Sequence, residues 1–362
     1  MIIKTINIKN FRNHENLSLN LQKGVNFFWG LNGIGKTNII EAVYYNFHQT
    51  SFRTKNKDHL IKEGRDGFDI EVHANHSFGD TQYNSIFNGK QKKFLINGNI
   101  ERSITNSIKN TPIVLSAPND FWTIKGSPQE RRNFIDSALS RLDNIYLKDL
   151  LIYKKIVKNR NAVLIRIYQR SCSFDEIYIW NEQLFTYSSK LLEKRLKYVE
   201  LLNLNLNEIL LKYYDDLKIN VNYYENKEFD FNYWENKEAF KLLFDKLKEK
   251  EVIRQKSLIG PHRDDIIFIR NNKEARFFTS QGETKELAVL LKLAELYILR
   301  NNFNNKPIFL WDDLGAELDI IKRDRLSSIL ADLDIQVLCT TTEIDTYKKN
   351  KFSSKFAFLQ VT

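Results

Sequence analysis

The alternation of apolar and polar residues predicts a β-rich start to the chain. Two such alternations precede residue 24, and a mostly apolar run at 25–29 follows them. Their apolar positions are Ile2, Ile6, Ile8, Leu17, Leu19 and Leu21. We therefore expect residues 1–28 to form a short β-meander and 25–29 to be a buried strand. Residues 68–100 are rich in Gly, Asn and alternating aromatic side chains, which predicts antiparallel strands and hairpins.

Near residue 130 the pattern changes from a two-residue to a helical period. Residues 131–250 contain neither proline nor glycine, and Leu, Ile, Tyr and Lys recur at helical spacing. Because heptads are not sustained, we expect a helical lobe inserted into the first domain and no long coiled coil. Gly260 and Pro261 mark a return to strands and turns. Residues 307–342 then predict a strand, a loop, a helix and a neighbouring strand.

Composition narrows the class of protein. Of the 362 residues, 42% are hydrophobic and 28% charged, which is typical of a soluble protein with a core. No stretch approaches the roughly 18 uninterrupted apolar residues of a membrane span, and the first residues lack a signal peptide's apolar block. We therefore expect no export, no membrane partner and a cytoplasmic location. Having only Cys172 and Cys339, the chain has neither a disulfide scaffold nor a four-cysteine zinc site.

The net charge of +10 favours a polyanionic partner such as nucleic acid, although a Lys- and Asn-rich composition also produces such a charge without one.

The segment after the strand at 25–29 has the spacing of a phosphate-binding loop, G-x-x-x-x-G-K-[ST]. Glycines allow successive backbone N–H groups to point inward at an anion, and the following helix adds its partial positive charge. Lys36 would reach the β- and γ-phosphates, and the Thr37 hydroxyl would bind Mg²⁺. A glycine-rich turn before a helix is the alternative, but the preceding strand and following helix favour the phosphate loop. Its residues are Gly30, Leu31, Asn32, Gly33, Ile34, Gly35, Lys36 and Thr37.

An acidic pair follows the apolar run at 307–311. Carboxylates at the carboxyl end of a central parallel strand lie where ligands bind in open α/β sheets. We expect Asp312 to hold Mg²⁺ and Asp313 to polarise the attacking water. Two acids that simply begin a turn are the alternative, and the phosphate loop upstream favours the catalytic interpretation. Thr340 to Thr342, at the end of the next apolar run, could place hydroxyls near the γ-phosphate.

A second candidate anion site precedes an apolar helical stretch at 287–299. Ser280, Gln281 and Gly282 combine a hydroxyl, a glycine and a helix N-terminus. Taken alone, the segment is more typical of an ordinary N-capped helix. Because one nucleotide does not need two phosphate sites on one subunit, we expect this surface to close over the γ-phosphate of ATP bound to another copy. That arrangement is typical of ABC-type ATPases.

Several separate motifs, in the same order, resemble those of the RecF family of bacterial DNA replication and repair proteins, which is related to SMC-type and ABC-type ATPases. The resemblance covers nearly the whole chain. Its blocks are Ile8–Asn13, Gly30–Asn38, Ser51–Thr54, Lys125–Pro128, Arg131–Asp136, Lys158–Asn161, Trp180–Leu184, Gly260–Asp265, the signature Ser280–Gly282, the acids Asp312 and Asp313, and a D-loop at Glu317–Asp319.

The resemblance implies a fold and a function. The fold is an α/β, ABC-type P-loop ATPase head, with a mixed or parallel sheet and an antiparallel β-subdomain, plus an inserted α-helical lobe. The expected boundaries are 1–136 and 257–362 for the two ATPase halves and 137–256 for the lobe. The function is an ATP-dependent DNA clamp in recombinational repair and replication restart: a weak, DNA-stimulated ATPase that dimerises with ATP.

The resemblance also implies ligands and partners. ATP and Mg²⁺ are the cofactors. The partners are double-stranded DNA near single-strand gaps and the mediators RecO and RecR, with which the protein would promote loading of a recombinase. Lys36, Asp312 and Asp313 would be catalytic, with Thr37 and Asp312 as metal ligands. Residues implied to contact the nucleotide beyond the phosphate loop are Asn38, Arg12, Asn13, Ser280, Gln281, Gly282 and Asp319.

Some positions depart from the family pattern. Trp311 stands where an aliphatic residue is usual, so its strand must pack a larger group. Glu283 and Lys285 stand where Gln and Arg are frequent, which would weaken contacts across a dimer. The switch histidine of transporter ATPases is absent, and no glutamine is identified for the Q-loop.

DNA contacts are less localised in the sequence. A solvated charged face is the favoured interpretation of each basic cluster alone, but together they suggest a groove that binds phosphates without base specificity. The candidates are Arg53, Lys55, Lys57, Lys90, Lys92, Lys93, Lys194, Arg195 and Lys197. For His262 we expect a structural polar cluster rather than catalysis, and a metal site at His73 and His76 is disfavoured.

Three alternatives differ in class. An SMC-like ATPase with a structural, chromosome-tethering role needs a long coiled coil between Lys36 and Ser280, for which the chain has no room. A transporter ATPase subunit is opposed by the inserted lobe and the basic charge. A P-loop kinase needs no signature segment.

Overall fold

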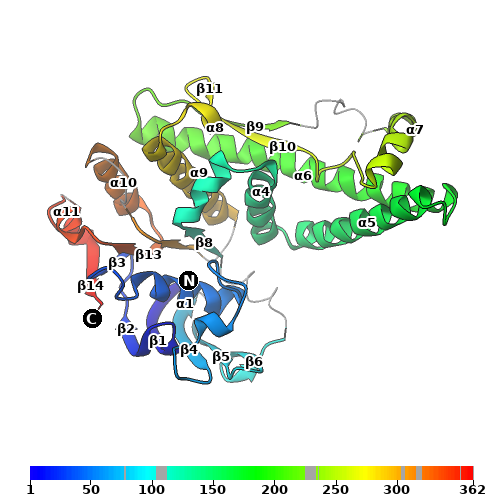
Figure 1. Ribbon diagram of the computed structural model, residues 1–362. Helices are drawn as coiled ribbons and strands as arrows, with labels where there is room; N and C mark the ends of the chain where they lie inside the picture. The colour runs from blue at the N-terminus through cyan, green and yellow to red at the C-terminus, as the bar shows by residue number, and fades with distance from the viewer. Residues whose placement is uncertain are drawn as a thin grey trace. The chain divides into compact units, whose positions relative to one another are not determined.

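The computed structural model describes residues 1–76, 79–102, 112–224, 234, 236–302, 306–314, 320–350 and 352–361. The chain divides into two compact units, coloured along the chain in Figure 1. The first unit contains Met1–Phe121, Ile209–Asp215 and Ser280–Thr362. The second contains Trp122–Glu208 and Asp216–Thr279.

A five-stranded parallel sheet forms the centre of the first unit. Its strand order is β14-β3-β13-β12-β8, and every neighbouring pair is parallel. The strands are β3 (Val25–Trp29), β8 (Ile113–Ser116), β12 (Ile308–Trp311), β13 (Gln336–Thr341) and β14 (Phe356–Gln360). All residues of β12 and β13 are buried, which explains their continuous apolar runs, since a parallel sheet is covered on both faces. The carboxyl ends of β3, β12, β13 and β8 therefore meet at one edge.

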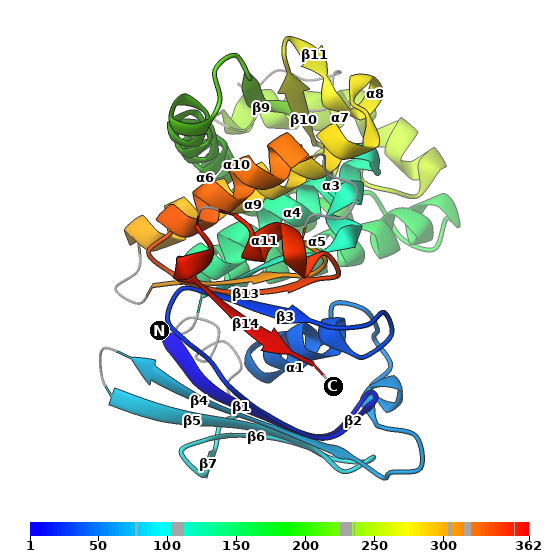
Figure 2. The ribbon, with the colours of Figure 1, turned by 90° about the vertical axis from the view of Figure 1, so that its left-hand side faces the viewer.

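A six-stranded antiparallel sheet lies on the other side of helix α1 (Lys36–His48). The strand order is β2-β1-β4-β5-β6-β7. Its strands are β1 (Ile2–Phe11), β2 (His14–Asn20), β4 (Phe68–His76), β5 (Gly79–Phe87), β6 (Lys92–Ile96) and β7 (Asn99–Ile100). Figure 2 shows α1 between the two sheets, and one hydrophobic core contains residues of both sheets and of this helix.

Helices α9 (Gln281–Asn302) and α10 (Ile320–Asp332) cover the other face of the parallel sheet (Figure 2). Helix α11 (Ile344–Lys348) follows β13. Short 3-10 helices at Asp58–Leu60, Pro118–Asp120 and Ser353–Lys355 belong to the connections.

The second unit is mainly helical. Its helices are most of α3 (Phe121–Lys125), α4 (Pro128–Leu142), α5 (Asn144–Tyr168), most of α6 (Asp175–Tyr213), α7 (Lys237–Arg254) and α8 (Ala275–Phe278). A small antiparallel sheet, β11-β10-β9, consists of β9 (Ile219–Tyr224), β10 (Asp265–Arg270) and β11 (Lys273–Glu274). The expected fold class, an α/β ATPase head with an antiparallel sheet and a mainly helical insertion, is confirmed by this architecture and by the structural neighbours described below.

Three strands differ from the sequence-based expectation. β3 does not continue the meander of β1 and β2 but joins the parallel sheet, because four of its five residues are buried and alternation is lost. β9 lies within the segment expected to be helical, and its strict alternation of buried and exposed residues suits a strand with one covered face. β8 was not expected either, although Ile113 and Val114 are apolar and buried.

Candidate functional site: a phosphate loop beside two acids

The predicted phosphate loop lies between β3 and α1, at the carboxyl edge of the parallel sheet. Gly30, Gly33 and Gly35 all have positive φ, at 153°, 82° and 106°, the range that glycine adopts most readily. Space is also restricted at Gly35, because a Cβ there would lie 2.5 Å from Asn13 Oδ1 and 2.6 Å from His14 Nε2. A side chain at this position would collide with the side chains of Asn13 and His14 and would disturb their hydrogen bonds to the loop.

Lys36 is buried within the loop that precedes it. Its ammonium donates to the carbonyl oxygens of Gly30, at 2.8 Å, and Leu31, at 2.9 Å. Burial lowers the pKa of Lys36, while Asp313 and Asp312 oppose that shift. The loop thus holds a cation that is bound only to neutral carbonyls and is available to an anion.

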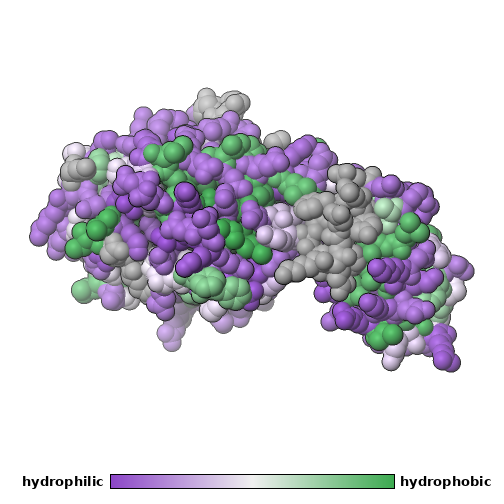
Figure 3. All heavy atoms as spheres, turned by 90° about the horizontal axis from the view of Figure 1, so that it is seen from above, coloured by the Kyte–Doolittle hydropathy of each residue, from purple (hydrophilic) through white to green (hydrophobic). Residues whose placement is uncertain are grey.

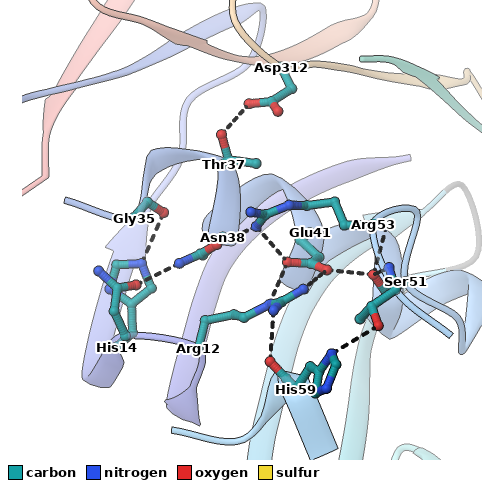
Figure 4. Close-up of polar contacts among 12 residues, drawn as sticks. Arg12, His14, Gly35, Thr37, Asn38, Glu41, Ser51, Arg53, His59 and Asp312 are labelled. Carbon is teal, nitrogen blue, oxygen red and sulfur yellow. Dashed lines mark hydrogen bonds and ion pairs between the residues drawn. The ribbon is translucent and has the colours of Figure 1, made fainter. Parts of the chain in front are cut away.

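Thr37 and Asp312 meet although they are far apart in sequence. The Thr37 hydroxyl donates to Asp312 Oδ1 at 2.8 Å, as the upper part of Figure 4 shows. Burial raises the pKa of the Asp312 carboxyl, and the hydrogen bonds from Thr37 and Thr340 oppose that effect. Two hard oxygen ligands therefore lie next to the phosphate loop.

Thr340, at the end of β13, organises both acids. Its hydroxyl donates to Asp312 Oδ1 at 2.8 Å and accepts the Asp313 N–H at 2.7 Å. Asp313 has a left-handed backbone, with φ of 63°, which is strained for a residue with a side chain. The Thr340 bond fixes this conformation, and the Asp313 side chain is exposed at the sheet edge.

A cavity of about 40 Å³ adjoins the acidic pair and has room for water. Polar side chains in its lining are those of Ser116, Asp120, Lys285, Asp312 and Asp313. Trp311, which departs from the family pattern, also lines it and is otherwise buried against Phe309. Lys285 and Trp311, which both depart from the family pattern, therefore lie beside Asp312 and Asp313 of the same chain.

Glu41 is a buried carboxylate at the centre of a polar network below the loop (Figure 4). Arg12 binds it with two parallel hydrogen bonds, Nη2 to Oε1 at 2.7 Å and Nε to Oε2 at 2.9 Å. Arg53 Nη1 and the Ser51 hydroxyl also donate to Glu41. Because the Arg12 guanidinium is engaged in this way, a contact between Arg12 and ATP would compete with these bonds.

The same network reaches the phosphate loop through amide side chains. Arg53 donates to Asn38 Oδ1 at 2.7 Å, Asn38 donates to Asn13 Oδ1 at 2.7 Å, and Asn13 donates to the carbonyl of Ile34 at 2.8 Å. Glu41 was not predicted from the sequence. The sequence feature that could have indicated it was a single acidic residue among apolar residues on the buried face of the predicted helix.

We predict that Glu41→Gln lowers the free energy of unfolding by about 3 kcal/mol, because it leaves a mostly buried Arg12 without its charge partner. Urea unfolding measures this change. Asp80→Asn is the matched control, since it removes an exposed ion pair with Lys4 that contributes less than about 1 kcal/mol. Equal small losses for both variants would contradict the role assigned to Glu41.

The predicted signature segment begins helix α9. Ser280 and Glu283 form a capping box: Ser280 N–H donates to Glu283 Oε2 at 2.9 Å, and Glu283 N–H donates to Ser280 Oγ at 3.3 Å. Ser280 and Gln281 are exposed, and Gly282 is half-buried in the first turn. Glu283, a departure from the family pattern, therefore stabilises its own helix, while Ser280 faces solvent.

The residues fit the ligands that the sequence implies. Hydroxyl and carboxylate oxygens suit Mg²⁺, which retains waters and binds few protein groups. Among the described residues no group of three or more His, Cys, Asp or Glu side chains could hold a metal, so Thr37 and Asp312 would share Mg²⁺ with phosphate and water. His73 contacts Glu71, whereas His76 is buried against Tyr83, so no shared metal site forms there.

The predicted D-loop, with Asp319, lies outside the described residues. In the described part of the chain, no helix combines the length and the apolar character that crossing a bilayer requires.

The basic residues predicted on the helical lobe do not form a free surface. Arg195 is buried, 2% exposed, and binds Asp136, so its assignment as a DNA contact is wrong: the helical period of α6 turns it inward. Lys194 is paired with Asp143 and Lys197 with Glu193.

His262 lies in a buried polar cluster. It contacts the Tyr153 hydroxyl and the carbonyl of Ser257, and burial lowers its pKa to about 3. A neutral imidazole held in this way supports the structural interpretation.

The other two basic clusters belong to the first unit, where Lys57 of one lies close to Lys92 of the other. We call Arg53, Lys55, Lys57, Lys90, Lys92 and Lys93 the basic patch. Lys92 donates to the carbonyl of Gln49 at 2.7 Å, and its pKa falls to about 8, mainly through burial and then through the charge of Lys57. Among the described residues, no ion pair joins Lys57 or Lys92 to a carboxylate. Unpaired ammonium groups so close together favour an anionic partner.

Comparison with known proteins places the chain in a family. The model of the RecF/RecN/SMC N-terminal domain matches residues 2–360. The DNA replication and repair protein RecF of Clostridium botulinum (strain Loch Maree) is 34% identical over 361 residues, covering 98% of this chain and 97% of that protein. RecF of Halalkalibacterium halodurans is 31% identical over 348 residues, covering 95% and 94%.

Solved structures agree with this result. The recombination mediator protein RecF bound to ATP, of the RecFOR pathway, has a TM-score of 0.82 and is 28% identical, covering 95% of this chain and 93% of that one. The Smc head domain of Pyrococcus furiosus has a TM-score of 0.59 at 16% identity, covering 100% and 94%, a likeness of fold alone. The SMC-like alternative is therefore less favoured, and the chain belongs to the RecF family of DNA replication and repair proteins, within the RecF/RecN/SMC N-terminal domain family.

Proposed function

We propose that the chain fulfils the role of its family in DNA replication and repair as an ATP-gated DNA clamp. Two copies hold two ATP molecules, each between Gly30–Thr37 of one copy and Ser280–Gly282 of the other. The γ-phosphate touches both surfaces, so ATP binds the closed dimer more tightly than the open one. This difference in affinity allows ATP to shift the equilibrium.

One observation carries the proposal: the geometry of the bond between Thr37 and Asp312, beside the buried ammonium of Lys36. It brings a phosphate loop and an acidic strand end to the same point, as ATP and Mg²⁺ require. ATP binding by a relative of known structure supports it. The exposed Ser280, with its hydroxyl at a helix N-terminus, supplies a second anion-binding surface.

In hydrolysis, Lys36 neutralises the developing charge on the β- and γ-phosphate oxygens. Thr37 and Asp312 would hold Mg²⁺, which would supply positive charge beside the phosphate groups. Asp313 orients a water molecule at the sheet edge and accepts its proton. Thr340 keeps both carboxylates in place. Loss of the γ-phosphate then opens the dimer and releases DNA, so slow turnover suits a switch.

DNA backbone phosphates bind the basic patch, without base specificity. RecO and RecR act with the clamp at single-strand gaps, which the RecFOR pathway of the structural relatives supports. Contacts with these partners load the recombinase.

Lys57→Gln combined with Lys92→Gln is expected to weaken DNA binding and to reduce the slope of log affinity against log salt by about 2, because each lysine neutralises one phosphate. Fluorescence anisotropy with a labelled duplex at several salt concentrations measures the slope. Lys197→Gln is the control, since Glu193 already pairs that lysine. An unchanged slope in the double variant would place the DNA elsewhere.

Raising the pH from 7 to 9 is expected to reduce the DNA affinity of the wild-type chain more than that of Lys92→Gln. The pKa of Lys92 is lowered to about 8, so its ammonium is charged below that pH and loses its proton above it. Titrations at matched salt, with Lys93→Gln as the control, measure the difference. Parallel pH curves for wild type and Lys92→Gln would show that this lysine does not contact DNA.

Sedimentation velocity with ATP and Mg²⁺, with and without gapped DNA, tests the proposed function. The expected result is a dimer that forms only with ATP and that DNA stabilises. A single copy under all of these conditions would reject the clamp.

A further inference from the structure

A cavity of about 430 Å³ lies between helices α6 and α7, within the second unit, and its volume is in the range of small-molecule pockets. Its walls are largely aromatic. Two ring pairs connect the helices, Phe185 with Phe240 at 5.2 Å between ring centres and Tyr178 with Phe244 at 6.3 Å. At the right-hand end of Figure 3, in the region of α7, apolar residues are exposed among hydrophilic ones. Such walls favour a ligand with an apolar body.

Asn181, one turn after Tyr178 on α6, is a buried polar residue of the lining, with 6% of its surface exposed. Its Oδ1 accepts a hydrogen bond from Arg160 Nε at 2.8 Å. Because a guanidinium group only donates, the amide must turn Oδ1 toward Arg160, and Nδ2 cannot face the same group. Among the described residues Nδ2 has no hydrogen-bond partner. An unpaired buried donor is costly, so a ligand that offers it an acceptor gains affinity.

Arg160 holds Asn181 and the aromatic wall in one arrangement. Its side chain is fully buried, and its other two nitrogens donate to Ser257 Oγ at 2.7 Å and to Glu251 Oε2 at 2.5 Å. The guanidinium also packs on the Phe244 ring, 5.3 Å from the ring centre. Both the donor and one wall of the cavity are therefore fixed before a ligand binds, which reduces the entropy lost on binding.

The charged residues of the lining are all engaged in ion pairs of opposite sign. These pairs are Lys237–Glu182, Lys241–Glu238 and Lys248–Asp245, with N–O distances of 2.8, 3.3 and 3.6 Å. A charged ligand would lose hydration without gaining an unpaired counter-charge. The balance of charge therefore favours a neutral ligand.

We propose that the cavity between α6 and α7 is a binding site for a small neutral molecule that combines an apolar ring with a carbonyl oxygen. The ring packs against Phe185, Phe240 and Phe244, and the carbonyl oxygen accepts a hydrogen bond from Asn181 Nδ2. Arg160 is the positioning residue that fixes the orientation of this donor. The lining residues and Arg160 all belong to the second unit, and the inference does not depend on the proposed ATP-driven dimer.

Three indole probes test the ligand chemistry on the full chain. Indole-3-carboxamide has the ring and the carbonyl, indole lacks the carbonyl, and indole-3-carboxylate adds a negative charge. Ligand-detected NMR titrations measure the dissociation constants. We expect the carboxamide to bind at least about fivefold more tightly than indole, which leaves Asn181 Nδ2 unpaired, and than the carboxylate, which finds no unpaired counter-charge. Equal affinities for the three probes, or no binding of the carboxamide, would overturn the proposal.

Asn181→Asp and Ile179→Trp locate the site. Aspartate keeps an oxygen for Arg160 but replaces the donor by a second acceptor, so the preference for the carboxamide over indole should disappear. Ile179 lines the cavity and is 66% exposed, so tryptophan there should obstruct the entrance without loss of thermal stability. It should weaken binding of the carboxamide at least about tenfold. Leu242→Trp, at a 72% exposed position of α7 outside the lining, is the control and should change neither property.

The two variants give independent answers. If Asn181→Asp does not fold, Ile179→Trp decides alone, because the side chain at this position is largely exposed. Carboxamide binding that is as tight in Ile179→Trp as in wild type would place the probe elsewhere on the chain and would reject the cavity as its site. An unchanged preference for the carboxamide in a folded Asn181→Asp variant would likewise reject the role of the amide.

Discussion

Ser280→Arg is expected to abolish ATP-driven dimerisation, while a single copy still binds ATP. The long cationic side chain would occupy the space into which the other copy's γ-phosphate must enter, and it would remove the hydroxyl that caps α9. The phosphate loop belongs to a separate segment and keeps Lys36, so nucleotide affinity in the single copy should not change. Light scattering after gel filtration measures the dimer, and equilibrium titration with a fluorescent ATP analogue measures affinity.

Ser280→Thr is the matched control, because threonine keeps both the hydroxyl and the capping role. It should dimerise as wild type does. Normal dimerisation of Ser280→Arg would mean that the signature segment does not face the other copy's nucleotide, and the clamp as described would be wrong.

Lys36→Ala is expected to reduce ATP affinity about a hundredfold and to prevent dimerisation and hydrolysis. The ammonium is the buried cation of the loop, and hydrogen bonds to a charged group are worth up to about 3 kcal/mol. Isothermal titration with ATP and Mg²⁺ measures the loss. Stability should change little, because the ammonium is bound only to two carbonyls of an exposed loop.

Lys36→Arg tests whether a positive charge alone at this position is sufficient for ATP binding and dimerisation. Arginine keeps the charge, but its planar group does not fit between the carbonyls of Gly30 and Leu31. It should bind ATP more weakly than wild type and should not dimerise. An arginine variant that binds and dimerises normally would show that charge alone suffices, and the detailed loop geometry would have no role.

Features encoded within a short segment were predictable from the sequence. The phosphate loop and the acids after β12 depend on local spacing and on an apolar run, so they could be located without knowing the sheet. Their meeting in space, with Thr37 bonded to Asp312, follows from the parallel order of the strands. The fold class was implied by the resemblance to the RecF family, which depends on the same short motifs.

Features that depend on long-range packing were not predictable. Glu41 looked like an ordinary helix acid, because its partner Arg12 lies 29 residues away in the turn between β1 and β2. Arg195 belonged to a basic cluster in the sequence, yet the rotation of α6 turns it toward Asp136. β9 was hidden in a segment without proline or glycine, where strand alternation competes with helical spacing. Single-sequence patterns do not decide such cases.

The strand order has a consequence for biosynthesis. β3 and the loop after it leave the ribosome early, but their neighbours β13 and β14 are among the last segments to be translated. At typical bacterial elongation speeds of about 5–20 residues per second, the nascent chain waits on the order of 15–60 seconds before these strands can pair. Until then both edges of β3, which carries Phe27 and Phe28, remain unpaired and accessible to chaperones. A polypeptide whose synthesis stops before β13 would lack a complete nucleotide-binding site.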